Sequence, residues 1–109
     1  MSSIFGSKLR MLREQQQIPQ RQLASILEID TATYCKIEKG DRQAKREQVI
    51  VLGNLLQADT KELLRLWSAD KVYNIIAEED EAAQILSVVA ENIAIHQHSK
   101  TEHETTSKI

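Results

Sequence analysis

The chain has 109 residues, enough for one domain or for one small domain with an appendage, and its net charge is −2. A single cysteine, Cys35, excludes an internal disulfide and fits a reducing cytoplasm. No paired Cys/His spacing predicts a metal site, no run of ~18 apolar residues predicts a membrane span, and the N-terminus lacks the apolar region of a signal peptide.

The charge is divided unevenly along the chain. Residues 1–67 carry 11 Lys/Arg against 8 Asp/Glu, whereas residues 68–109 carry 3 against 8. The first part is therefore basic and the second acidic, and a negative total does not exclude nucleic acid as a partner of the first part.

The first predicted helix begins near Ser2 or Ser3, either of which can cap it. Its apolar positions follow the helical spacing of a buried stripe: Phe5, Leu9 and Leu12. Pro19 disfavours helical geometry in the residue before it, so this helix ends within the run Gln15–Ile18.

Residues 20–42 predict two short helices joined by a tight turn. Asp30 is a suitable N-cap for the second of them, over residues 31–39, and Gly40 is a suitable left-handed C-cap. Small, polar and cationic side chains are predicted to face outward on that helix: Thr31, Ala32, Cys35, Lys36 and Lys39. Such a helix fits a DNA major groove.

This stretch resembles the phage-repressor/Cro-like (XRE) helix-turn-helix proteins. The residues that carry the resemblance are Gln20, Leu23, Ala24, Ile37, Glu38 and Gly40. The resemblance extends from about Phe5 to about Trp67 and implies an all-α, five-helix lambda-repressor-like DNA-binding domain. One departure is Glu28, which stands in the inter-helix turn where the family usually carries Gly. A positive φ there would cost roughly 1 kcal/mol.

The resemblance also implies roles for individual residues. Phosphate contacts are expected from Gln20 and Arg21 near the start of the first motif helix, and from the basic loop that follows the second. Base contacts are expected near the start of the second. The full DNA-binding set is Gln20, Arg21, Thr31, Ala32, Thr33, Lys36, Arg42, Lys45 and Arg46. Arg13 and Glu38 are expected to form a structural ion pair, and Tyr34 to lie in the core. For several of the contact residues the alternative is a merely solvated side chain.

Two further helices complete the expected domain at residues 1–67. One buries Val49, Leu52 and Leu56; the other, from Thr60 to about Trp67, follows a capping-box-like pair, Asp59 and Glu62. Residues 68–95 predict a helical extension with a long apolar stripe that includes Ile85, Leu86, Val89 and Ile93, which we expect to mediate dimerisation. Residues 96–109 are polar and predict a flexible tail.

The leading hypothesis is a cytoplasmic, sequence-specific transcriptional regulator that binds a two-fold DNA operator as a homodimer through residues 31–39. Restriction–modification controllers, phage repressors, antitoxins and stress regulators all remain open. No catalytic constellation or cofactor motif is present, so we expect neither an enzyme nor a cofactor. The alternative is a protein-interaction module that works mainly through its C-terminal helices. For Cys35, a small residue in a serine-like position is favoured over a thiol switch.

Overall fold

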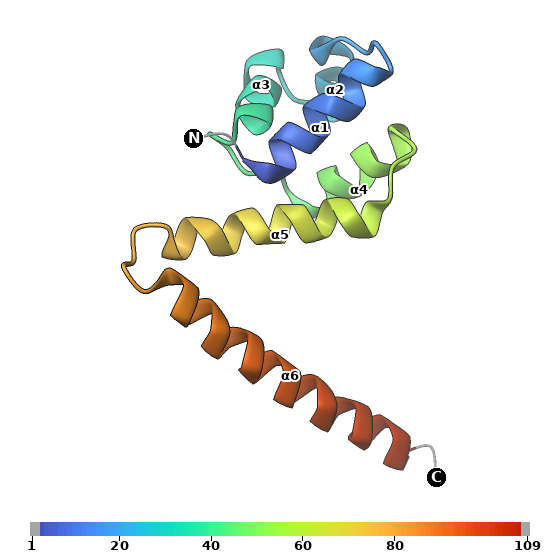
Figure 1. The fold of residues 1–109 in the computed structure, drawn as a ribbon. Helices are drawn as coiled ribbons and strands as arrows, with labels where there is room; N and C mark the ends of the chain where they lie inside the picture. The colour runs from blue at the N-terminus through green and yellow to red at the C-terminus, as the bar shows by residue number, and fades with distance from the viewer. Residues whose placement is uncertain (1–2, 108–109) are drawn as a thin grey trace. The chain divides into compact units, whose positions relative to one another are not determined.

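The computed structural model describes residues 3–107, with side chains up to residue 97. Over this range the chain is all-helical, which confirms the predicted fold class (Figure 1). The helices in chain order are α1 (Ile4–Gln15), α2 (Gln20–Ile26), α3 (Thr31–Lys39), α4 (Arg46–Leu55), α5 (Thr60–Ile76) and α6 (Ala82–Ser107).

The first four helices end in the same way, with a left-handed residue followed by a hydrogen bond back to the last helical turn. The backbone bonds are Ile18 N to Arg13 O, Ile29 N to Ala24 O, Asp41 N to Lys36 O and Ala58 N to Gly53 O. The left-handed residues are Gln17, Glu28, Gly40 and Gln57. Only one is a glycine, and Glu28 has the positive φ, 59°, that its place in the turn suggested. These Schellman-type ends allow the short connections between the helices.

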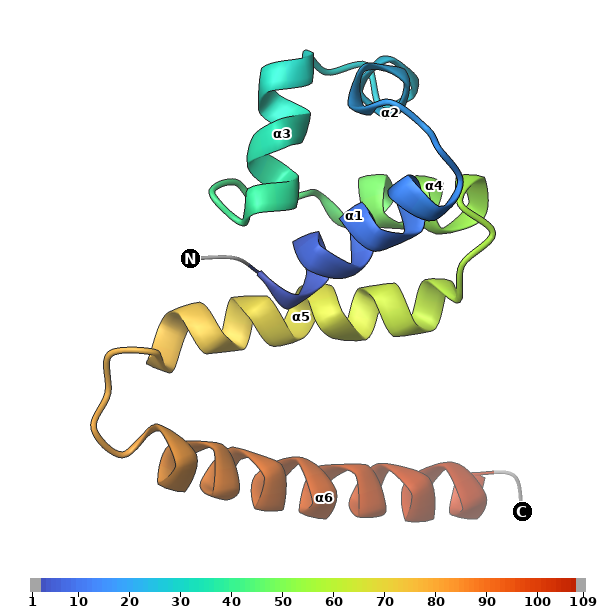
Figure 2. The same ribbon diagram turned by 45° about the horizontal axis from the view of Figure 1, so that its top comes forward.

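One hydrophobic core joins α1 to α5. It comprises Phe5, Leu9, Leu23, Ala24, Tyr34, Ile37, Ala44, Val49, Leu52, Leu56, Leu63 and Trp67. The helices α2 and α3 have 7 and 9 residues, too few to be stable alone in water. Their stability therefore comes from this shared core, and Figure 2 shows α2 beside α3 and α3 beside α1.

Helix α5 is longer than the sequence analysis predicted. It was expected to end near Trp67 but continues to Ile76, because residues 68–76 contain no Gly or Pro to stop it. The additional turns carry Asp70, whose carboxylate accepts hydrogen bonds from the Ile4 and Phe5 backbone N–H groups, both at 3.0 Å. Together with Ser3, which accepts from Gly6 N at 2.7 Å, Asp70 satisfies the free N–H groups at the start of α1. The first compact unit accordingly extends to Tyr73.

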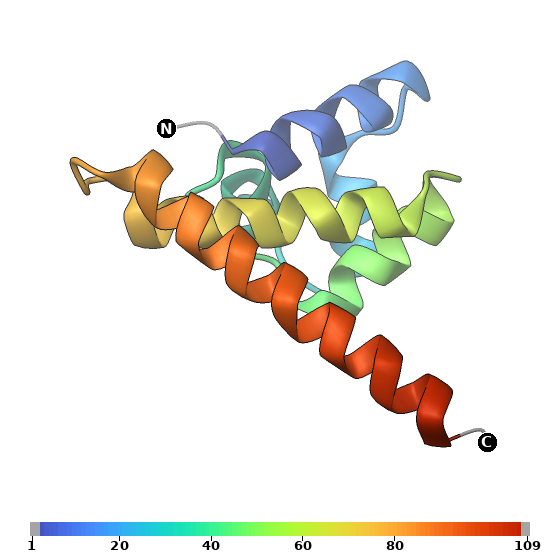
Figure 3. The ribbon, with the colours of Figure 1, turned by 60° about the horizontal axis from the view of Figure 1, so that its bottom comes forward.

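The second compact unit begins at Asn74 and contains α6. Figure 3 shows α6 as one continuous helix. It passes residue 95, where a flexible tail was predicted to begin, and remains helical as far as Ser107, since no Gly or Pro interrupts it. The side chains of the rest of that predicted tail, residues 98–109, lie outside the described residues. On α6 the apolar side chains of Leu86, Val89 and Ile93 are 43–49% exposed.

No helix in the described part of the chain is long and apolar enough to cross a membrane. Among the same residues, no cluster of His, Cys, Asp or Glu side chains could hold a metal ion.

Candidate nucleic-acid interface

Helix α3 is well defined at both ends. The Asp30 carboxylate accepts a hydrogen bond from Thr33 N at 2.7 Å, and hydrogen bonding to Thr33 lowers the pKa of that carboxyl. Gly40 closes the helix with φ 87°. Its buried face consists of Tyr34, Ile37 and Glu38, while three of the predicted base-contacting residues, Thr31, Ala32 and Lys36, are exposed and the fourth, Thr33, is half-buried. The helix therefore presents a polar, cationic face to solvent.

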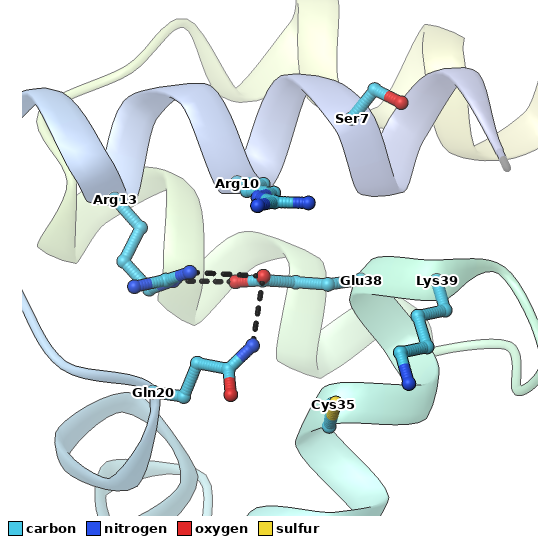
Figure 4. Close-up of a pocket in the computed structure, with 7 residues that line it drawn as sticks. All are labelled: Ser7, Arg10, Arg13, Gln20, Cys35, Glu38 and Lys39. Atoms are coloured by element: carbon cyan, nitrogen blue, oxygen red, sulfur yellow. Dashed lines mark hydrogen bonds and ion pairs between the residues drawn. The ribbon is translucent and has the colours of Figure 1, made fainter.

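The Arg13–Glu38 pair expected from the resemblance is present and joins α1 to α3 (Figure 4). Arg13 Nε donates to Glu38 Oε2 at 2.6 Å, and its Nη2 donates to Glu38 Oε1 at 3.1 Å. The guanidinium also donates from Nη1 to Ile18 O at 2.9 Å, at the end of α1. This is a bidentate pair, the geometry in which Arg binds a carboxylate most strongly.

Gln20 is a third member of this cluster. Its amide Nε2 donates to Glu38 Oε1 at 3.1 Å, so one carboxylate contacts α1, α2 and α3 together. Gln20 was predicted to contact a DNA phosphate; the structure places it, half-buried, on Glu38. Because an amide has two N–H donors and an acceptor oxygen, this bond leaves part of its capacity for a phosphate. Arg21, the next residue, is exposed.

Burial and hydrogen bonding have opposite effects on the pKa of Glu38 in this cluster. Glu38 is only 6% exposed. Burial by itself would raise the pKa of Glu38, but the interactions with Arg13, Tyr34 and Gln20 outweigh it and hold that pKa below its usual value. The buried Tyr34 hydroxyl interacts electrostatically with Glu38 but forms no hydrogen bond of regular geometry with any described residue, and burial raises the pKa of Tyr34 far above its usual value.

A glycine lets α1 approach this end of α3 closely. Gly6 is buried, and a Cβ atom added to it would collide with the Glu38 carbonyl oxygen and lie 2.6 Å from Ser3 Oγ. Close packing at Gly6 and the ion pair at Arg13 thus hold α3 at two points along α1.

The other predicted phosphate-contacting residues lie after α3. Arg42, Lys45 and Arg46 are all exposed, on residues 41–45 and the first turn of α4. Lys45 N donates to Gln48 Oε1 at 2.8 Å and so fixes the start of α4. The Arg46 guanidinium lies over the Trp67 ring, 5.3 Å from its centroid. The three cations therefore follow α3 closely in the chain.

Seven residues enclose an open hollow of ≈670 Å³ beside α3: Ser7, Arg10, Arg13, Gln20, Cys35, Glu38 and Lys39 (Figure 4). Cys35 is half-buried against this hollow, and not on a fully exposed flank as the sequence suggested. Arg10 is paired with Glu14 at 2.6 Å on the surface of α1. This hollow was not predictable from local sequence patterns, because its lining comes from three helices.

Two other residues that hold the interface were missed, Asp70 and the indole N–H of Trp67. Trp67 Nε1 donates to Ala44 O at 2.8 Å, across 23 residues of sequence, and Asp70 reaches Ile4 across 66. No local pattern signals such long-range bonds.

The comparisons with known proteins agree with this geometry. A family model described as a helix-turn-helix domain matches residues 4–67, which is more than half of the chain and includes α1 to α4 and the first part of α5. No curated protein and no solved structure matches the chain. The resemblance found at Gln20–Gly40 is confirmed at the level of this domain, and the chain belongs to the helix-turn-helix domain family.

Proposed function

We propose that this protein is a non-enzymatic, sequence-specific transcriptional regulator that binds a two-fold DNA operator as a homodimer and reads it with α3. The observation that carries the proposal is the exposed face of α3, which is held rigidly by the Glu38 cluster and followed by three exposed cations.

The chemistry of that face fits direct reading of base pairs. Thr31 offers a hydroxyl and a methyl group, Ala32 offers a methyl to a thymine, and Lys36 can donate to guanine O6 and N7. Thr33 is half-buried beside them and has a smaller accessible surface. The exposed cations Arg21, Arg42, Lys45 and Arg46 supply phosphate contacts, which fix the docking register without reading sequence.

The homodimer part of the proposal is supported by α6. Ile85 is half-buried, whereas Leu86, Val89 and Ile93 are 43%, 44% and 49% exposed, all on one face of the helix. A helix stripe of this kind stays in water unless another surface covers it, and a second copy of the chain would also supply the second reading helix that a two-fold operator needs.

The dimer is tested by sedimentation equilibrium at tens of micromolar protein. Val89→Asp should shift the mass from dimer to monomer, because it places a charge within the stripe. Gln84→Asp is the matched control, since it adds the same charge to an exposed polar position on the opposite side of α6 and should leave the mass unchanged. A monomeric wild-type chain would refute the homodimer.

The regulator is tested by selecting bound duplexes from a random DNA pool at ~150 mM salt, which suppresses non-specific phosphate binding. We expect a two-fold motif, whose half-site spacing reports the distance between the two copies of α3. Lys36→Gln should relax one position of that motif if Lys36 contacts a base. Lys61→Gln, an exposed lysine on α5, should leave the motif intact. Recovery of no motif, with binding that vanishes at this salt, would refute the proposal in favour of a protein-interaction module.

A further inference from the structure

Trp67 joins the segment after α3 to α5. It is 5% exposed, and its Nε1–H donates to Ala44 O at 2.8 Å in a buried hydrogen bond. Ala44 is itself buried and belongs to the non-helical segment of residues 41–45 that precedes α4. One indole therefore fixes the backbone of the loop that carries Arg42 and Lys45.

The same indole also contacts two cations. Lys71 Nζ lies 3.8 Å from the ring centroid and the Arg46 guanidinium carbon 5.3 Å, both within the range of cation–π attraction. Arg46 is the first residue of α4, where the helix dipole disfavours a positive charge. The π face of Trp67 offsets that cost and restricts where the guanidinium lies.

The ring leaves the donors of Arg46 available. The Arg46 side chain is exposed and makes no hydrogen bond or ion pair to any residue that the structure describes. A guanidinium carries five N–H donors in its plane, and stacking on a ring uses its face and not those donors. A side chain whose position is already restricted also loses less entropy when a ligand binds it.

From these contacts we propose that Trp67 is a positioning residue for DNA binding, which presents Arg46 to a backbone phosphate. The inference rests on the proposed function, because it requires DNA at this face. Trp67 touches no DNA itself: it acts through Arg46, with the Ala44 hydrogen bond holding the adjacent loop in register.

The test measures the affinity for a 20-bp duplex of random sequence as a function of salt, with Trp67→Leu, Trp67→Phe and Arg46→Gln, alone and combined. Trp67→Leu should weaken binding about two- to five-fold, the range of one exposed cation–π contact. Trp67→Phe keeps an aromatic face and should weaken it less. Arg46→Gln should lower the slope of log affinity against log salt by about 0.9 for each bound subunit.

The decisive result is the coupling between the two positions. With Arg46→Gln already present, either Trp67 substitution should weaken binding by much less than it does alone, because only the hydrogen bond to the Ala44 loop is then lost. Arg65→Gln removes an exposed charge from α5 and is the matched control, expected to leave the Trp67 effect unchanged. Circular dichroism below the melting temperature verifies that each variant is folded. If Trp67→Leu is unfolded, the coupling is measured with Trp67→Phe alone.

Two outcomes would overturn the inference alone: Trp67 variants that bind like wild type, or a loss that persists in full when Arg46 is absent. Failure of the wild-type chain to bind the duplex at any salt would overturn the proposed function together with it.

Discussion

Replacing Glu38 with Gln is expected to destabilise the first compact unit by about 2–4 kcal/mol. Removing one partner of a buried ion pair costs about 3–5 kcal/mol, because the other charge is left without compensation. Here that charge is Arg13, whose side chain is only 12% exposed. The substituted amide keeps one acceptor oxygen, and a retained hydrogen bond returns about 1 kcal/mol.

The assay is urea unfolding followed by circular dichroism, with all variants at the same protein concentration because dimerisation would contribute to stability. Glu14→Gln is the matched control. It removes a carboxylate from an ion pair of the same 2.6 Å length, but both Arg10 and Glu14 are more than half exposed. An exposed pair of this kind contributes under about 1 kcal/mol. Equal losses for Glu38→Gln and Glu14→Gln would refute the reasoning from burial.

The same pair predicts a pH dependence. The pKa of Glu38 is lowered in the folded protein, so its contribution is fully present above the ordinary carboxyl pKa of about 4.3 and is lost as pH falls through the folded value. The difference in unfolding free energy between wild type and Glu38→Gln should therefore be constant near neutral pH and shrink in acid. A difference that grows as the pH falls would contradict the sign of the shift.

Three further substitutions test the packing around α3. Gly6→Ala should lower stability by about 1–3 kcal/mol in urea unfolding, because the added Cβ would collide with the Glu38 backbone. This collision should outweigh the higher helix propensity of Ala. A gain in stability would show that α1 can shift to make room for the Cβ. Asp70→Ala should cost about 1–2 kcal/mol by removing the acceptor for two N–H groups of α1, and an unchanged melting temperature would show that water replaces it. Glu28→Gly should raise stability by roughly 0.5–1 kcal/mol in the same unfolding assay, because φ is 59° there, and a loss of stability would contradict the backbone strain at this residue.

Much of the helix-turn-helix unit was predictable from residues close together in the chain. Asp30 at the start of α3 and Gly40 at its end satisfy backbone groups within four residues of themselves. The apolar spacing that placed Leu23 and Ile37 in the core is equally local. Such signals act through the sterics and hydrogen bonding of a single turn, so the sequence alone carries them.

Other features of the interface depend on residues that meet only in the folded chain. The predicted end of α5 was wrong because nothing in the local sequence distinguishes Trp67 from the residues of the following turns. Asp70 stabilises those turns by capping α1, and its partner Ile4 is 66 residues away in sequence. Glu38 was expected to have one partner, yet the approach of α2 adds Gln20 as another.

The sequence by itself determined which helices form, which side chains other than Cys35 face outward on α3 and which family the domain resembles, since all three follow from local periodicity and short motifs. Only the tertiary structure decided that Trp67 holds Arg46 and the Ala44 loop. The physical reason is that cation–π attraction and hydrogen bonding depend on the distance between groups in space and not along the chain. The indole N–H and the carbonyl that it binds are 23 residues apart in sequence, so no local pattern indicates that they meet.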